Sequence, residues 1–404
     1  MRVGISVSYD SLIFKDGIVF PVRIAGDVLQ AYWIVKYLLE NYEVSFNKLS
    51  ENNDINHLFH FFLPFFGSNF YGRVGFNPNF FNFLLYNIFT SNSLVSRVFA
   101  QIFSLINVKW VRSFFVNTVL YFRKEDFFKK NKVYIRKLIE NFVIAKNLKY
   151  VICNSFFEKR EFISFLDLIG IKINDIDFFV INNPLYYQEI DYLLDTDQFI
   201  DFEKNIKKIM EEKLPQDYVL FIGRFDRIKN IFNFIKEYKR KRINKYVPLV
   251  VLGSVQEYDI DYYKKIKEMI GDGVFLFNLE ELMEQLNLLE KDITWYYKVR
   301  KLAIEFMRNS KVVIVPSIVE SFSFVGLESL YLNKPLIITK NSPYGELFEN
   351  FIDKSIKLID PLNIVLDRDY FDFPNFVPLK DYVKENFSVE KIAKAYLEVW
   401  RKYV

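Results

Sequence analysis

The stretch that decides the fold is residues 311–339, KVVIVPSIVESFSFVGLESLYLNKPLIIT. Two short apolar runs, Val312–Val315 and Leu336–Thr339, are bounded by prolines, which is typical of buried strands that end and begin at a fixed residue. Between them the pattern predicts a loop and then a short helix over about 326–332. A strand, a helix and a second strand in this order indicate a parallel α/β sheet.

Two carboxylates lie between these strands, with seven residues separating them. We expect Glu320 in the loop at the carboxyl end of the first strand and Glu328 in the first turn of the helix. Ligands of open parallel sheets bind at this edge, where backbone N–H groups and the positive end of a helix dipole face them. Carboxylates at this edge suit hydroxyl groups, such as those of a ribose or a hexose.

A second unit, YVLFIGRFDRIKNIFNFIKEY at residues 218–238, predicts a buried strand, a turn at Gly223 and a helix from about Asn230. Arg224 and Lys229 fall in the turn. The forked guanidinium of Arg and the point charge of Lys, beside a helix N-terminus, are suited to the oxygens of a diphosphate. On their own, such residues are also common as solvated surface charges.

Together the two motifs resemble the donor half of glycosyltransferase family 4, whose members have the GT-B fold and transfer a sugar from a nucleotide sugar. The family's G-R-x-x-x-x-K turn corresponds to Gly223, Arg224 and Lys229, and its E-x7-E motif to Glu320 and Glu328. Further similar stretches follow the family's order along the chain: YVICNSFFEKREFI at 150–163, VINNPLYY at 180–187, VPLVVLGS at 247–254, NSPYGELF at 341–348 and FSVEKIAKAYLEVWRKYV at 387–404.

The resemblance implies a GT-B α/β architecture of two Rossmann-like domains whose parallel sheets face across a cleft. The first, at 1–200, is then the acceptor-side domain, and the second, at 213–386, binds the nucleotide-sugar donor. A C-terminal helix at 387–404 crosses back to the first. The polar stretch 195–217 is the best candidate for the linker between the domains.

The resemblance also implies roles for single residues. Arg224 and Lys229 stabilise the departing diphosphate, Glu320 faces the donor sugar, and Glu328 holds the ribose hydroxyls, with the anomeric configuration retained. Since the two cations already neutralise the phosphates, no metal or other cofactor is expected.

Several donor-binding positions depart from the family's pattern. Ser321 and Ser323 replace the glycines of the usual E-G-F-G sequence, and Ser323 supplies the same backbone N–H only if the turn does not require a positive φ. Phe324 and Val325 complete the expected donor-binding turn. Near the N-terminus, a predicted strand, MRVGISVS, and a loop through Gly17 and Pro21 lead to a helix from Asp27. Gly26 in that loop either contacts the donor or only starts the helix.

The composition limits the classes of partner and the compartment that can be expected. With 404 residues the chain can bury large cores, and a net charge of +4 lacks the basic excess expected of a nucleic-acid binder. Cys153 is the one cysteine, so no intrachain disulfide can form, and a reducing compartment is expected. The N-terminus lacks the pattern of a signal peptide, and no apolar run is long enough to span a bilayer. We therefore expect a cytoplasmic protein, with or without peripheral membrane contact.

The aromatic segment 58–89 has two interpretations: core with loops, or an acceptor-side surface that contacts lipid, helped by Arg97, Lys109 and Arg112. His57 and His60 are expected to be structural, without metal-ligand spacing. The stretch 279–310 is expected to be an extra surface helix.

The acceptor, whether glycan, lipid-linked or protein, stays open, as do two other classes of function. One is an epimerase or a phosphorylase on the same fold. The other is a non-catalytic scaffold that binds nucleotide sugars.

Overall fold

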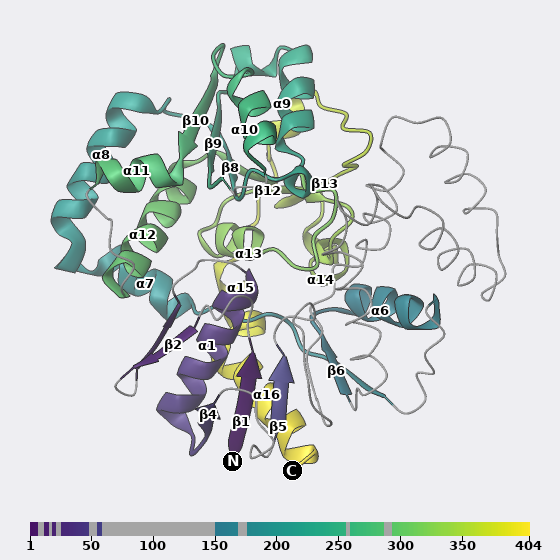
Figure 1. Ribbon diagram of the computed structural model, residues 1–404. Coiled ribbons are helices and arrows are strands. Elements are labelled where there is room, and N and C mark those ends of the chain that lie inside the picture. The colour runs from purple at the N-terminus through teal and green to yellow at the C-terminus, as the bar shows by residue number, and fades with distance from the viewer. Residues whose placement is uncertain are drawn as a thin grey trace, which may run out of the picture. The chain divides into compact units, whose positions relative to one another are not determined.

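The computed structural model describes residues 1–6, 12–15, 18–21, 26–47, 55–58, 150–168, 176–255, 259–286 and 293–404. The chain divides into two compact units (Figure 1): Met1–Ser11, Leu38–Asn182 and Ala395–Val404 form the first, and Leu12–Tyr37 and Asn183–Lys394 form the second. The domain limits expected from the sequence, at 1–200, 213–386 and 387–404, stay a prediction.

The second unit is built on a six-stranded parallel sheet with the order β10-β9-β8-β11-β12-β13. Its strands are β8 (Val219–Ile222), β9 (Leu249–Gly253), β10 (Val274–Asn278), β11 (Val312–Val315), β12 (Leu336–Thr339) and β13 (Ile356–Ile359). Counted along the chain within this sheet, the order is 3-2-1-4-5-6, which is that of dinucleotide-binding sheets. The direction of strand addition reverses between β8 and β11, so a ligand site is expected at their carboxyl ends.

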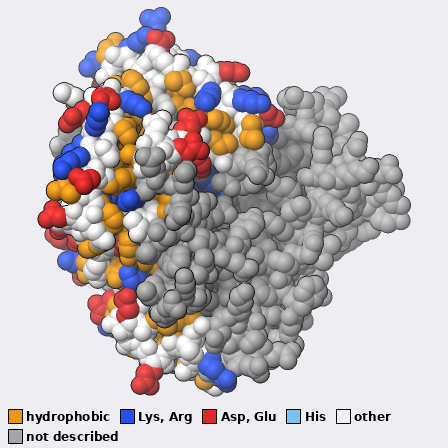
Figure 2. Space-filling model, turned by 60° about the vertical axis from the view of Figure 1, so that its left-hand side comes forward, with side chains coloured by type: hydrophobic (Ala, Val, Ile, Leu, Met, Phe, Trp, Pro, Cys, Tyr) orange, Lys and Arg blue, Asp and Glu red, His pale blue; other side chains and the backbone are white. Residues whose placement is uncertain are grey.

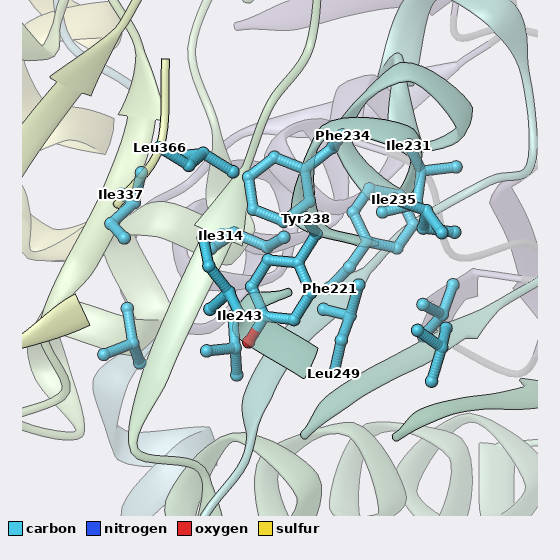
Figure 3. Close-up of a cluster of buried hydrophobic side chains, with 14 of the residues drawn as sticks. Phe221, Ile231, Phe234, Ile235, Tyr238, Ile243, Leu249, Ile314, Ile337 and Leu366 are labelled. Atoms are coloured by element: carbon cyan, nitrogen blue, oxygen red, sulfur yellow. The ribbon is translucent and has the colours of Figure 1, made fainter. Parts of the chain in front are cut away.

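Both faces of this sheet are covered, because its strands are apolar at nearly every position. On one face, Phe221 and Ile314 join side chains of the helix α9 in a buried cluster with Tyr238 at its centre (Figure 3). The Tyr238 hydroxyl is satisfied by the carbonyl of Val247 at 2.6 Å. The alternate strand residues, such as Leu220, are also fully buried, and helices α12 and α13 contact strands β8 and β11.

Helices connect these strands in the right order for βαβ units. Those whose residues lie wholly in the second unit are α7 (Tyr187–Asp195), α8 (Ile200–Lys213), α9 (Ile231–Arg240), α10 (Ile260–Lys267), α11 (Leu279–Gln285), α12 (Ile293–Asn309), α13 (Phe324–Tyr331), α14 (Tyr344–Leu347) and α15 (Lys380–Phe387). Helix α8 occupies most of the stretch 195–217, which stays the predicted boundary between the domains.

Helix α12 differs from the surface helix that was expected. The insert at 279–310 was predicted to be an extra surface helix, yet Tyr296, Lys301 and Leu302 are fully buried. The sequence did not indicate that α12 is buried, because Arg300 and Lys301 interrupt its apolar face and buried cations are rare. In the structure both cations are paired with carboxylates. Helix α12 is thus part of the core.

The segment before helix α1 (Gly26–Asn41) is also not the loop that was expected. Strands β2 (Leu12–Lys15) and β3 (Ile18–Pro21) pair antiparallel, from Leu12 with Pro21 to Lys15 with Ile18. The sequence between them is Asp-Gly, a strong signal for a two-residue hairpin turn that the sequence interpretation passed over.

The described residues of the first unit form two short parallel sheets. In one, β1 (Arg2–Ser6) lies between β4 (Ser45–Asn47) and β5 (Ile55–Leu58), and in the other β6 (Tyr150–Cys153) pairs with β7 (Asp177–Val180). Helix α6 (Phe156–Leu168) follows β6. Helix α16 (Val389–Lys402) begins in the second unit and its last residues belong to the first, where Trp400 is fully buried against Phe46.

The surface of the described part carries mixed charge. On the face shown in Figure 2, basic and acidic side chains are interspersed over the described residues. Within the described ranges, no helix is both long and apolar enough to cross a membrane. The aromatic segment 58–89, apart from Leu58, lies outside the described residues, as do His60, Arg97, Lys109 and Arg112.

Candidate functional site

The two sequence motifs meet at the carboxyl ends of β8 and β11. Lys229, from the loop after β8, places its Nζ 2.5 Å from Oε1 of Glu320, in the loop after β11. These residues are 91 positions apart in the chain. Their side chains are mostly buried, at 25% and 11% exposed, so the pair is shielded from bulk water.

The loop after β8 is shaped by Asp226. Its carboxylate accepts a hydrogen bond of 2.9 Å from the Lys229 backbone N–H, which caps the short 3-10 helix Arg227–Lys229. The other oxygen of Asp226 lies 3.0 Å from Nη2 of Arg224. Arg224 is 41% exposed, and it is thus the more accessible of the two cations.

Asn230 joins three segments of the site and was not singled out from the sequence. Its backbone has the left-handed conformation, with a φ of 58°, which Asn tolerates better than most residues. Its amide donates to the carbonyls of Pro316 and Pro361, at 3.2 and 2.9 Å. The buried side chain therefore fixes the β8 loop, and Lys229 with it, against the loop that carries Glu320.

Glu320 is held by its own neighbours as well. The Ser317 hydroxyl donates to the same Oε1 at 2.5 Å, and the Glu320 backbone N–H donates to the carbonyl of Asn341 at 3.0 Å. The carboxylate is therefore fixed where it contacts the cation of the other motif.

Serine at position 323 is compatible with this turn. Ser323 has a φ of −155°, which is extended backbone open to any residue, and its hydroxyl caps α13 by accepting from the Gly326 N–H at 3.2 Å. A side chain at Gly326 would stand 2.7 Å from the Tyr344 hydroxyl, which donates to the carbonyl of Ser323. Glycine at position 326 is thus required by packing.

Helix α13 starts at Phe324, earlier than the predicted 326, because the Ser323 cap was not recognised. Glu328 therefore lies in the second turn and not, as expected, in the first. Phe324 packs edge-on against Trp33 of α1, with ring centroids 5.2 Å apart. Val325 is half-buried beside it.

Glu328 is 2% exposed and its Oε1 lies 2.7 Å from Nη2 of Arg300 on α12. Sequence reasoning missed Arg300, since nothing in the pattern of α12 indicates a partner 28 positions further on.

Glycines bring two loops together at the β8 end. A Cβ on Gly253, the last residue of β9, would stand 2.0 Å from the carbonyl oxygen of Gly223, whereas a Cβ on Gly223 would meet only the ring of Phe221 at 3.4 Å. Gly26 is the first residue of α1, one position before the predicted start.

Asp259 is an unexpected acid near the β8 loop. Burial raises the pKa of Asp259 to about 6, and the charge of Asp226 adds to this, while Arg224 and Arg227 oppose it. Among the described residues, no group of His, Cys, Asp and Glu is arranged to hold a metal ion. His57 lies in β5, in the first unit.

Comparison with known proteins bears on this arrangement. Residues 202–357, which include both motifs, match the family model described as Glycosyl transferases group 1. All of the matched residues lie in the second unit. A protein of Methanocaldococcus jannaschii described as an uncharacterized glycosyltransferase is 24% identical over 265 residues, which are 64% of this chain and 58% of that protein.

Two solved structures resemble nearly the whole chain, including the residues that match the family model. Anabaena HepE, in complex with UDP and glucose, has a TM-score of 0.54 at 12% identity, covering 99% of each chain. AviGT4, a glycosyltransferase involved in avilamycin A biosynthesis, has a TM-score of 0.52 at 12% identity, covering 100% of this chain and 97% of its own. At these identities the two structures establish the fold alone, which is GT-B, as predicted.

Proposed function

We propose that this protein is a retaining glycosyltransferase, similar to family 4, that moves a sugar from a nucleoside-diphosphate sugar to an acceptor. The observation that carries the proposal is the meeting of Lys229 and Glu320 at the switch point of the sheet, 2.5 Å apart. A cation for the diphosphate and a carboxylate for the sugar hydroxyls are thereby placed side by side. The Anabaena neighbour contains UDP and glucose, which favours a nucleotide sugar as the ligand class.

The chemistry follows from the charges. When the bond between the anomeric carbon and the diphosphate breaks, negative charge grows on the departing oxygen. Cations already in place, Arg224 and Lys229, stabilise that charge more than the ground state, and so they lower the barrier. The acceptor oxygen forms the new bond to the same face of the sugar, and its proton passes to the leaving phosphate.

Glu320 then accepts hydrogen bonds from the donor sugar, and Glu328 from the ribose. Gly223, Ser323, Phe324 and Val325 line the donor-binding turns. Ser323 contributes its backbone N–H in the place of the usual glycine. Gly26, at the start of α1, is the further donor-binding position in this proposal.

A divalent metal is not needed in this scheme, since Arg224 and Lys229 provide the counter-charge that Mg²⁺ supplies elsewhere. The acceptor is a glycan, a lipid-linked or a protein hydroxyl. The reaction belongs in the cytoplasm, with peripheral membrane contact of the N-terminal half where the acceptor is a lipid.

The test is the release of nucleoside diphosphate from a panel of nucleotide sugars, measured with and without simple acceptors. We expect one donor to be turned over, and the Arg224→Ala variant to lose that turnover. Binding of nucleotide sugars without any release would favour the non-catalytic scaffold. Interconversion of the sugar, or phosphate-dependent cleavage, would favour the epimerase or the phosphorylase.

A further inference from the structure

Arg300 joins two buried carboxylates in the second unit. Its Nη2 lies 2.7 Å from Glu328 Oε1, and its Nε donates to Glu189 Oε1 on α7 at 3.3 Å. All three side chains are at most 3% exposed. The guanidinium also lies over the ring of Trp33, 5.7 Å from its centroid. A single cation is therefore shared between α7 and α13.

The second carboxylate is satisfied by another group. Both oxygens of Glu189 accept from the hydroxyl of Tyr296, at 2.8 and 3.0 Å. Burial raises the pKa of Glu189, which favours its neutral form beside a single guanidinium. Glu328 is the nearer carboxylate to Arg300, at 2.7 Å from its guanidinium against 3.3 Å for Glu189.

The two oxygens of Glu328 have different surroundings. Oε1 is buried against Arg300, without a well-aligned hydrogen bond. Oε2 is not among the buried unpaired atoms of the described residues, and it has no hydrogen bond to the described part of the chain. One oxygen is thus anchored by Arg300, and Oε2 is the oxygen left to accept a hydroxyl.

We propose that Arg300 is a positioning residue for nucleotide recognition: it anchors Glu328 through Oε1, so that Oε2 is fixed in place for the ribose hydroxyls. The proposal rests on the proposed function, because the ribose role of Glu328 belongs to it. Arg300 acts through Glu328 alone and does not contact the nucleotide itself.

The test compares UDP with 2′,3′-dideoxy-UDP, which lacks the two ribose hydroxyls, by calorimetric titration. If the wild type binds ADP, GDP or CDP more tightly than UDP, the titrations use that nucleotide and its 2′,3′-dideoxy analogue in place of the two UDP forms. Wild type should bind the hydroxylated form about ten- to hundredfold more tightly, as for hydrogen bonds to a charged group. Arg300→Met should reduce this ratio to near one and leave the affinity for the dideoxy form unchanged.

A matched control lies next to Arg300. Lys301 is also a buried cation of α12, and it contacts Glu203 and the carbonyl of Leu193 instead of Glu328. Lys301→Met should lower the stability of the protein but preserve the ratio of the two affinities. Arg300→Lys, which keeps the charge without the fork, should fall between wild type and Arg300→Met.

Folding is controlled by a double variant. Arg300→Met leaves Glu328 unpaired, whereas Arg300→Met with Glu328→Gln removes both charges and should be the more stable. In the Glu328→Gln background, Arg300→Met should cause no further loss of UDP affinity. Additive losses, or equal losses for UDP and its dideoxy form, would overturn the positioning role. If no nucleoside diphosphate binds the wild type, the proposed function itself is wrong, and the inference with it.

Discussion

Lys229 and Glu320 neutralise each other, and this pairing has a consequence for ligand binding. A diphosphate must compete with Glu320, and with the hydroxyl of Ser317, for the same charged region. Removing the charge of Glu320 should therefore free Lys229 for phosphate.

We predict that Glu320→Gln binds UDP more tightly than wild type, by about fivefold, as expected from the loss of an ion pair worth about 1 kcal/mol. The same variant should transfer sugar more slowly, because the carboxylate for the donor sugar is lost. Titration with UDP and steady-state kinetics measure the two effects. Weaker UDP binding in Glu320→Gln, equal to that of Glu328→Gln, would show that the roles of the two glutamates are assigned wrongly.

Removing either cation should slow the reaction. Arg224→Ala and Lys229→Ala should each lower kcat/KM about a hundredfold, the usual loss when one stabilising group is removed from a developing negative charge. Arg224 is 41% exposed, so the melting temperature of Arg224→Ala should stay near that of wild type. Lys229→Ala should melt lower, because it leaves the mostly buried carboxylate of Glu320 without its cation. Wild-type rates in either variant would remove the diphosphate assignment.

Asp259 makes stability depend on pH. Its pKa is raised from 3.8 to about 6 on folding, so the folded state binds the proton more tightly than the unfolded chain does. Stability should therefore fall as pH rises between these values. At a pH above the pKa of the folded state, Asp259→Asn should raise the free energy of unfolding by about 1 kcal/mol, after allowance for solvent screening. At a pH below the pKa of the unfolded state, the substitution should not change the free energy of unfolding. Urea unfolding at both extremes checks this, and an equal gain at both would refute it.

At the scale of elements, the site depends on how closely the turns after β8 and β9 approach. Gly253→Ala should destabilise the protein by about 1–3 kcal/mol and weaken UDP binding, because its Cβ would meet the backbone oxygen of Gly223 and displace the turn that carries Arg224. Gly223→Ala is the matched control, since its Cβ has only an ordinary contact. If both variants unfold at the same urea concentration, the close approach is unimportant.

Elements bounded by local signals could be predicted from the sequence. The strands Val312–Val315 and Leu336–Thr339 were predicted with their observed limits, because prolines stand beside both. The pairing of β2 with β3 was overlooked, although the Asp-Gly sequence between them is a signal for a hairpin.

Long-range pairing could not be predicted in this way. The burial of α12 depends on carboxylates of α7 and α8 that pair with Arg300 and Lys301. Likewise, the role of Asn230 depends on carbonyls 86 and 131 positions away. The two motifs could be found from their spacing, but the contacts that fix them depend on the tertiary structure.

At the scale of the whole molecule, the mechanism predicts independence from divalent metal. Transfer should persist in excess EDTA, because Arg224 and Lys229 supply the counter-charge for the phosphates. Turnover that is abolished by EDTA and restored by Mg²⁺ or Mn²⁺ would mean that the donor site is built differently.

The most direct test of the central claim is the thermal stability of the protein with nucleoside diphosphates and nucleotide sugars, compared between wild type and the double variant Arg224→Ala with Lys229→Ala. At a hundred times Kd, a ligand adds about 2.7 kcal/mol to the stability of the state that binds it. We predict a raised melting temperature for wild type with at least one of these ligands and none for the double variant. No shift with any ligand, or the same shift in both proteins, would contradict a diphosphate site at the β8 and β11 ends.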